Sequence, residues 1–347
     1  MTDRELGKQL KKAAALVKSS GTVAIFPHIH ADGDAIGSAF GIAFVLRDMG
    51  KAVTVFMEED PGDKLRFLLD GDIRYVITDG DSSKYTGVSY DLAIINDCSD
   101  LKRTGTRLSI IEKASKKIKI DHHVEIDKFG DEMLVDPSWS ATCEGMFLLA
   151  EKLGYDFTKA AHGKKAATAF YTGLLTDSGQ FGYSNTTPLT HRVASELMKA
   201  TGDVSDIARN MFEIKTYSKV KIFAKAYEHA EIFADGKAVF TYVSQEDIDE
   251  TGATHEDTDG ISSSLCAVAG IEASVFAKPD QNVKGHWKLS MRSYRYCDVA
   301  EIAGRLGGGG HVRAAGCDFE GTFEEMKQKM IEEICCGIEK GRNTQHQ

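Results

Sequence analysis

The chain has 347 residues, of which 42% are hydrophobic, so it is long enough for two packed domains. Its formal charge is −10, from 42 basic and 52 acidic side chains, which argues against a protein that coats long nucleic acid. Its seven cysteines include no C-x-x-C pair and fit neither a disulfide framework nor a zinc-finger spacing, so we expect a reducing, cytoplasmic environment. The N-terminus does not resemble a signal peptide, and no apolar run reaches the about 18 residues of a membrane-spanning helix, so we expect no membrane association.

The first half of the chain alternates short apolar runs with helical patterns. After a helical pattern in residues 1–20, apolar runs that are too short for helices occur at 22–26, 52–57, 91–97 and 116–121. Helical patterns lie between and after them, at 36–49, 142–153 and about 161–175. Such an alternation predicts an α/β domain, with buried parallel strands and helices on both faces of the sheet.

The second half of the chain predicts a smaller α/β domain. Residues 189–233 are mostly helical and polar, which suits a connector between domains. Strand patterns follow at 237–243, 272–278 and 287–293, then a helix at 299–306, the run "GGGGHVRAAG" and a last helix at about 322–340. We therefore predict domains at 1–188 and 234–347, joined by the connector 189–233.

The stretch "FPHIHADGDAIGS" places His28, His30, Asp32 and Asp34 at alternate positions directly after the first strand. One straight strand would spread these side chains over about 20 Å, too far for a single metal ion. Gly33 lets the chain curl, so the two carboxylates can reach two ions about 3.5–4 Å apart. The alternative stays open here, because Asp-Gly-Asp is common in turns and a histidine near a strand end is often a partly buried core residue.

Further candidate ligands follow other predicted strands. Asp97 and the triplet Asp121-His122-His123 end two strands, and Asp177 lies in "TDSG" after a helix. Each aspartate alone is as well explained as a helix cap. Together, however, strand ends of a parallel sheet meet at one edge, and carboxylates with imidazoles but no thiolate suit Mn²⁺ or Mg²⁺ better than a structural zinc.

At this point the chain resembles the DHH phosphoesterase superfamily with its DHH-associated domain, and within it the bacterial nanoRNase/pAp phosphatase group. The resemblance rests on five motifs in order: "HIHADGDAIGS", "NDCSDLKR", "DHH", "TDSGQF" and "GGGGHVRAAG". It implies a catalytic domain that holds two divalent metal ions, most simply Mn²⁺ with Mg²⁺ as the alternative. The ligands it implies are His28, Asp32 and Asp97 for one ion and Asp34, Asp97, His122 and Asp177 for the other, with His30 as a neighbour only.

The resemblance also implies roles around the substrate. His123 would contact the scissile phosphate, Arg103 would clamp it, and Asp121 would orient the histidines. Without the resemblance, a solvated loop arginine is the preferred interpretation of Arg103. The nucleotide end of the substrate would be gripped across the domain cleft by Arg292, Ser293, Gly307, Gly308, Gly309, Gly310 and His311.

The glycine run admits two other readings that we set aside. A flexible linker would have serine-rich flanks, which are absent here, and a P-loop needs a following Lys-Ser/Thr, which is also absent. We expect instead a loop whose backbone approaches a ligand closely.

Three functions remain in competition. The first is hydrolysis of short RNA oligonucleotides and 3′-phosphoadenosine 5′-phosphate (pAp), by in-line attack of a hydroxide shared by the two ions. The second keeps this chemistry for a cyclic dinucleotide such as c-di-AMP, or for linear pApA. The third is a non-catalytic nucleotide-binding protein, which all six metal-ligand positions argue against. The sequence leaves the substrate, the preferred metal and the oligomeric state open, a homodimer included.

Overall fold

The computed structural model describes residues 2–69, 71–124, 127–281, 283 and 285–345. The chain divides into two compact units, Met1–Ile214 and Lys215–Gln347. The stretch 189–233, predicted as a connector, is shared between them. Its first helix packs Val193 and Leu197 into the core of the first unit, whereas Ile222 and Ala226 pack into a core of the second.

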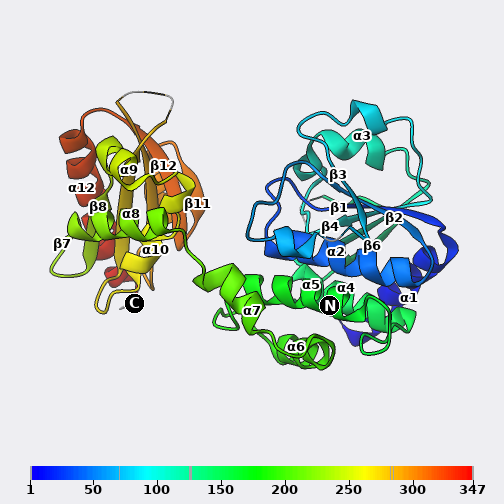
Figure 1. The fold of residues 1–347 in the computed structure, drawn as a ribbon. Helices are drawn as coiled ribbons and strands as arrows, with labels where there is room; N and C mark the ends of the chain where they lie inside the picture. Colours follow the sequence, from blue (N-terminus) through cyan, green and yellow to red (C-terminus); the bar gives the residue numbers. More distant parts are fainter. Residues whose placement is uncertain (1, 70, 125–126, 282, 284, 346–347) are drawn as a thin grey trace. The chain divides into compact units, whose positions relative to one another are not determined.

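A parallel sheet lies at the centre of the first unit (Figure 1). Among the described residues its strand order is β3-β2-β1-β4-β5-β6, and every neighbouring pair is parallel. The strands are β1 Thr22–Phe26, β2 Ala52–Met57, β3 Arg74–Ile77, β4 Leu92–Asn96, β5 Lys116–Asp121 and β6 Glu132–Val135. The four predicted strands are confirmed. The predictions missed β3 and β6, which have four residues each and lie at the edges of the sheet, where partly exposed side chains leave only a weak apolar pattern.

Both faces of this sheet are covered, as the sequence predicted. Val23 and Ile25 of β1 pack into a large helical layer, and Ala24 and Phe26 face a second apolar cluster on the other side, which includes Ile110 of α3. In Figure 1, α2, α4 and α5 lie on one face and α3 on the other. The helices of this unit are α1 Asp3–Ser19, α2 Gly33–Asp48, α3 Leu108–Ile111, α4 Thr142–Leu153, α5 Gly163–Asp177, α6 Pro188–Thr201 and α7 Ser205–Ala208, with short turns η1 Arg66–Leu68, η2 Ser83–Tyr85, η3 Leu101–Arg107 and η4 Arg209–Glu213.

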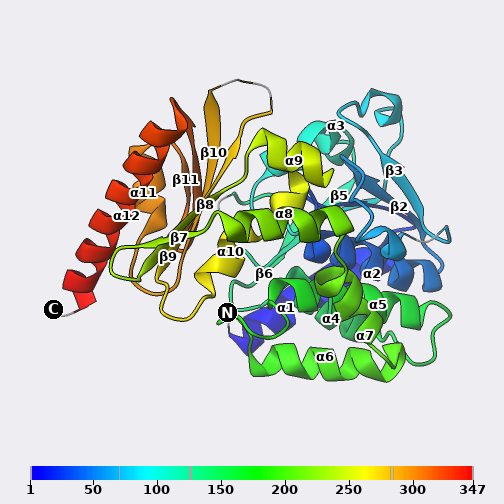
Figure 2. The same cartoon turned by 60° about the vertical axis from the view of Figure 1, so that its left-hand side comes forward.

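The second unit contains a mixed sheet between two layers of helices (Figure 2). In its described part the strand order is β11-β12-β10-β9-β8-β7, in which only β8 and β9 pair in parallel. The strands are β7 Glu231–Phe233, β8 Ala238–Tyr242, β9 Ala273–Pro279, β10 His286–Ser293, β11 Gly309–His311 and β12 Ala314–Glu320. The helices are α8 Tyr217–Glu228, α9 Gln245–Thr251, α10 Ile261–Cys266, α11 Val299–Arg305 and α12 Phe323–Gln345, with the short turn η5 Glu256–Thr258.

The glycine run is not wholly the loop that we expected. Gly309–His311 form β11, which pairs with Ala314–Gly316 of β12. A Cβ on Gly308 would lie 2.2 Å from the Gly316 carbonyl oxygen, and one on Gly310 would lie 2.5 Å from that of Ala314. These two glycines are therefore required by the close approach of two strands. Within the described residues, no helix combines the length and apolar character needed to cross a membrane.

Candidate metal centre

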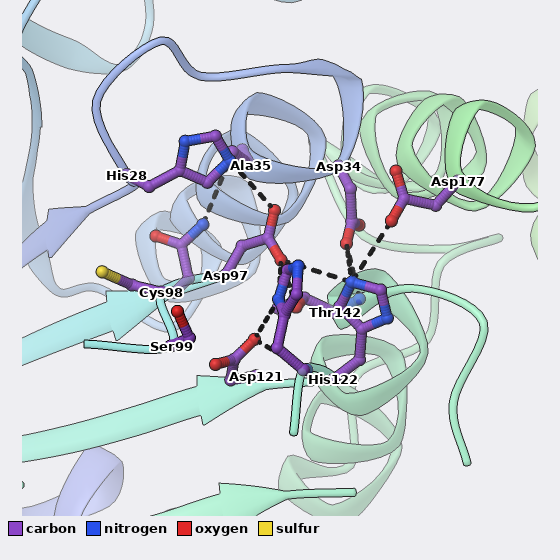
Figure 3. Close-up of polar contacts among 12 residues, drawn as sticks. His28, Asp34, Ala35, Asp97, Cys98, Ser99, Asp121, His122, Thr142 and Asp177 are labelled. Atoms are coloured by element: carbon purple, nitrogen blue, oxygen red, sulfur yellow. Dashed lines mark hydrogen bonds and ion pairs between the residues drawn. The ribbon is translucent and has the colours of Figure 1, made fainter. Parts of the chain in front are cut away.

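The carboxyl ends of three adjacent strands bring the predicted ligands together. The strands β1, β4 and β5 are neighbours in the sheet, and the segments that follow them carry His28, Asp97 and the triplet from Asp121 to His123. Figure 3 shows His28, Asp97 and His122 pointing toward one another, joined by Asp34 from α2 and Asp177 from α5. The convergence follows from the topology, because parallel strands end at the same edge of a sheet.

The start of α2 separates the two aspartates of "ADGD". Asp32 is the N-cap and its Oδ1 accepts hydrogen bonds from the Asp34 and Ala35 amides, at 3.1 and 3.0 Å. Gly33 is the first helical residue, so the chain curls by starting a helix. A Cβ on Gly33 would lie 2.6 Å from the Thr176 side chain, which means that this glycine allows α2 to begin against the end of α5.

Asp34 is completely buried and is held by the start of α4. Its carboxylate accepts hydrogen bonds from the amides of Thr142, at 2.6 Å, and Cys143, at 3.0 Å. These amides belong to the first turn of α4, where backbone N–H groups have no partner within the helix. The N-cap of this helix is Ala141, which makes no side-chain hydrogen bond. The Thr142 hydroxyl instead donates to Asp97 Oδ1, at 2.9 Å.

Asp97 lies between two groups of ligand atoms. His28 Nε2 is 3.5 Å from Asp97 Oδ2 and 3.9 Å from Asp32 Oδ1, which makes the first group. On its other side, Asp97 Oδ1 is 3.6 Å from His122 Nε2. Asp97 has a φ of +57°, a left-handed conformation that aspartate tolerates better than most side chains. With this backbone conformation, the Asp97 carboxylate lies between the two groups of ligand atoms.

The second group surrounds His122. Its Nε2 is 3.2 Å from Asp177 Oδ2 and 4.0 Å from Asp34 Oδ2, and each residue offers an atom within 4.8 Å of the others. This nitrogen is buried and has no partner of good hydrogen-bond geometry among the described residues. Three carboxylates thus face one imidazole nitrogen that is not otherwise used, which is an arrangement suited to a shared cation.

The electrostatics of the site show an excess of negative charge. Burial and the Asp97 and Asp177 carboxylates raise the pKa of Asp34 well above its usual value. Burial lowers the pKa of His122, but the close Asp177 carboxylate and the charges of Asp34 and Asp97 outweigh it and bring that pKa to about 10. Burial also raises the pKa of Asp177, whereas the hydrogen bond with His28 and the nearby imidazoles leave that of Asp97 lowered despite burial. Buried carboxylates this close together need cations, and an oxygen- and nitrogen-only donor set fits hard or borderline divalent metals.

His123 and Asp121 form a pair at the open side of the site. His123 Nδ1 is 2.9 Å from Asp121 Oδ1, and the His123 amide donates to the same oxygen at 3.1 Å. The His123 side chain is 41% exposed, whereas Asp121 is completely buried. His30, by contrast, is turned to Glu59, at 2.8 Å, and belongs to none of the ligand groups found among the described residues.

Arg103 lies in η3, on the loop that follows Asp97. Its carbonyl oxygen accepts a hydrogen bond from the Ile29 amide, at 2.8 Å, which ties this loop to the segment carrying His28. Its guanidinium has neither a hydrogen bond nor an ion pair within the described part of the chain. It is therefore available to an anionic ligand.

Sequence reasoning did not identify the residues that hold this loop in place. Glu58 accepts hydrogen bonds from the Thr106 amide and hydroxyl, both at 3.0 Å, and pairs with Arg107 at 3.1 Å. Arg107 is completely buried, and burial lowers its pKa to about 10 despite the Glu58 charge. Gly105 packs against both Glu58 and Ile29. A buried Glu-Arg pair has no local sequence signature, because Glu58 follows β2 and Arg107 ends η3, far apart in the chain.

The predicted substrate residues of the second unit lie along β10 and the glycine run. The Arg292 guanidinium donates to the Met291 carbonyl, at 3.0 Å, and the Ser293 hydroxyl lies 3.4 Å from the Val312 carbonyl oxygen. His311 is exposed on β11, and Gly307 and Gly309 have open space where a side chain would stand. Their contact with a nucleotide stays a prediction.

Two family models match this chain. The N-terminal domain model of the DHH family matches residues 22–174, and the DHHA1 domain model matches residues 235–336. A bifunctional oligoribonuclease and PAP phosphatase NrnA from Thermus thermophilus is 27% identical over 94% of both chains. A cyclic-di-AMP phosphodiesterase PdeA from Listeria monocytogenes is 24% identical over 92% of this chain but only 48% of its own length.

The fold is also found in a solved structure. An exopolyphosphatase-related protein from Bacteroides fragilis matches with a TM-score of 0.84 and 24% identity, over 94% of this chain and 96% of that one. The two family models together span most of the chain and, apart from β7, the strands of both sheets described above. The chain therefore belongs to the DHH family and carries a DHHA1 domain.

Proposed function

We propose that this protein is a metal-dependent phosphoesterase that hydrolyses short RNA oligonucleotides and pAp. The observation that carries the proposal is the position of Asp97, with His28 and Asp32 on one side and His122 on the other. The name of the Thermus relative, similar over nearly its whole length, supports the substrate class.

Two divalent cations fit the donor set of this site. We infer that His28, Asp32 and Asp97 hold one, and that Asp34, Asp97, His122 and Asp177 hold the other. Four carboxylates balance the charge of two such ions. When bound, these ions supply Lewis-acid chemistry to a phosphate group and to water. We propose Mn²⁺ as the natural metal, because mixed carboxylate and imidazole ligands suit it.

The remaining residues of the site act on the substrate itself. The Arg103 guanidinium can donate to two oxygens of a phosphate group, and the imidazole of His123, which is 41% exposed, can contact the scissile phosphate. Asp121 accepts from His123 Nδ1 and so leaves Nε2 to face the substrate. Arg292, Ser293, His311 and the glycine run would bind the nucleotide end.

The compartment and assembly are also proposals. All seven cysteines are free, which supports a reducing compartment such as the cytoplasm. A homodimer is compatible with the substrate class and is tested by measuring the mass in solution.

The test compares initial rates of the Mn²⁺-loaded protein on pAp, a linear RNA dinucleotide and c-di-AMP at one low concentration. We expect fast turnover of the first two and little of the third. Preferential opening of c-di-AMP would instead support the function named for the Listeria relative, which is the second candidate. Absence of turnover on all three, with metal bound, would contradict both.

Two substitutions at opposite ends of β4 make the test specific. Asp97→Asn at the carboxyl end should reduce turnover by at least about a thousandfold, because it removes a ligand shared by both groups. Asp91→Asn at the amino end is the matched control, since the Asp91 carboxylate accepts hydrogen bonds from the Gly21 and Thr22 amides and belongs to none of the ligand groups found among the described residues. Normal activity in Asp97→Asn would overturn the ligand assignment.

A further inference from the structure

A lysine is buried beneath the proposed metal centre. Lys119 lies in the middle of β5 and its side chain is 0% exposed. Its Nζ donates to the carbonyl oxygens of Ser99, at 2.9 Å, and Asp127, at 3.3 Å, and lies 4.8 Å from the centre of the Phe129 ring. Lysine is among the residues least often buried, and it requires compensation when it is.

The compensating charge is Asp121, two residues further along the same face of β5. Lys119 Nζ is 3.8 Å from Asp121 Oδ2, and both side chains are fully buried. The other oxygen, Oδ1, is used by the amide and ring of His123. Among the described residues Oδ2 has no hydrogen-bond partner, so the ammonium group is the one counter-charge that the structure gives it. A buried carboxylate without such a partner would be strongly disfavoured.

The same ammonium group reaches the loop after β4. Ser99 follows Asp97 by two residues, and its carbonyl oxygen is the nearest acceptor of Lys119 (Figure 3 shows Ser99 beside Asp97 and Asp121). One buried side chain therefore joins the segment carrying Asp97 to the carboxylate that orients His123. Since that carboxylate belongs to the proposed site, displacement of Lys119 would change how it holds His123.

We propose that Lys119 is a positioning residue, whose buried charge fixes Asp121 so that His123 keeps its proton on Nδ1 and presents Nε2 to the substrate. Its kinetic consequence rests on the function proposed above, but its structural consequence does not. Lys119 itself touches neither the ligand groups nor the substrate, and it acts through Asp121.

The first test is kinetic, with a matched control on the same strand. Lys119→Met should lower kcat for pAp at least tenfold and leave KM within about twofold, because binding groups such as Arg103 are unchanged. Lys116→Met removes an exposed lysine of β5 that pairs with Asp131 at 2.7 Å, and it should leave both constants unchanged. In an Asp121→Asn background, Lys119→Met should cost no further activity. An unchanged kcat, or an equal loss in that background, would overturn the proposal.

The second test does not depend on activity. Nitrogen-15 NMR of histidine-labelled, metal-free protein, assigned with a His123→Gln variant, should show the His123 proton on Nδ1 in the native chain and a mixture of tautomers in Lys119→Met. Lys119→Gln serves if the methionine variant does not fold. A native His123 protonated only on Nε2 would overturn the proposal whichever variants fold. If the native protein hydrolyses no phosphoester but this tautomer pattern holds, the proposed function fails and the positioning role stands.

Discussion

The hydroxyl of Thr142 contacts one of the proposed metal ligands, although none of the sequence motifs includes this residue. It donates to Asp97 Oδ1, while the Thr142 amide donates to Asp34 Oδ2. Substitution of a residue that orients a metal ligand through a hydrogen bond typically lowers metal affinity or activity by about ten- to a hundredfold.

We expect Thr142→Val to lower Mn²⁺ affinity by about ten- to a hundredfold, because the isosteric methyl group cannot hold the Asp97 carboxylate. Isothermal titration with Mn²⁺ measures this. Thr251→Val is the control, since it also removes a buried hydroxyl bond, to the Asp247 carbonyl, but in the second unit. Equal affinities in all three proteins would show that Thr142 has only a packing role.

Asp48 lies outside the site and stabilises the carboxyl end of α2, the helix that carries Asp34. It ends α2, and its carboxylate accepts hydrogen bonds from the Tyr155 hydroxyl, at 2.7 Å, and the His162 amide, at 2.9 Å, with His162 Nδ1 2.5 Å away. Burial raises the pKa of Asp48, but these hydrogen bonds outweigh it and the pKa is lowered overall.

A lowered folded-state pKa means that this stabilisation is present above the unfolded pKa, about 3.9, and is lost as the pH falls through the folded value. Asp48→Asn should therefore reduce the free energy of unfolding by about 1–3 kcal/mol at pH 7, and the difference should shrink below about pH 4. Urea titrations at pH 7, 5 and 3.5 measure it. The exposed Asp63→Asn should match the native chain at each pH, and a pH-independent loss in Asp48→Asn would contradict the argument.

At the scale of elements, the contact between α2 and α5 decides how closely the ligands on the two helices approach. A Cβ on Gly37 would lie 2.4 Å from the Ala169 carbonyl oxygen, and one on Gly173 would lie 2.7 Å from Asp34 Oδ1. Small residues thus bring the helix that carries Asp34 against the helix that carries Asp177.

Gly37→Ala should destabilise the first unit by about 1–3 kcal/mol, because the added methyl group meets backbone that cannot turn away. Gly7→Ala in α1 is the matched control, with nothing within 4 Å of the new Cβ, and should stabilise by up to about 1 kcal/mol through helix propensity. Chemical denaturation compares them. If both substitutions had the same effect, the close approach of α2 and α5 would not be limiting.

Strand prediction failed where pairing with a neighbouring strand, and not the local sequence pattern, determines the strand. β12, Ala314–Glu320, includes two alanines, a glycine and an aspartate, yet it pairs with β10 over seven residues. β3 and β6 owe their conformation to buried neighbours in the same way. Periodicity identifies strands that are buried on both faces and misses those that a neighbour imposes.

At the scale of the whole molecule, each unit has its own apolar core around its own sheet. The proposed ligands for both ions all belong to the first unit. A ligand that binds only the folded form of one unit stabilises that unit by mass action.

We therefore expect two unfolding transitions by calorimetry. Mn²⁺ should raise the midpoint temperature of only one of them, that of the first unit. At a hundred times the dissociation constant the increase in the free energy of unfolding should be about 2.7 kcal/mol. Removal of the metal with a chelator should restore the original transition, and the Asp97→Asn protein should show a much smaller shift. Equal stabilisation of both transitions would mean that the units unfold together or that metal also binds the second unit.

The sequence by itself determined the fold class and the composition of the candidate site. Buried parallel strands have a strong apolar pattern, and the residues that follow them must gather at one edge, so a cluster of carboxylates and imidazoles after β1, β4 and β5 was predictable from local sequence and topology, and the resemblance selected His28 and His122 within it. Only the tertiary structure decided what holds them. Thr142 and Asp34 are 108 residues apart, Glu58 and Thr106 are 48, and Lys119 and Ser99 are 20. Such hydrogen bonds and charge pairs depend on distances across the folded core, which no local pattern of residues encodes.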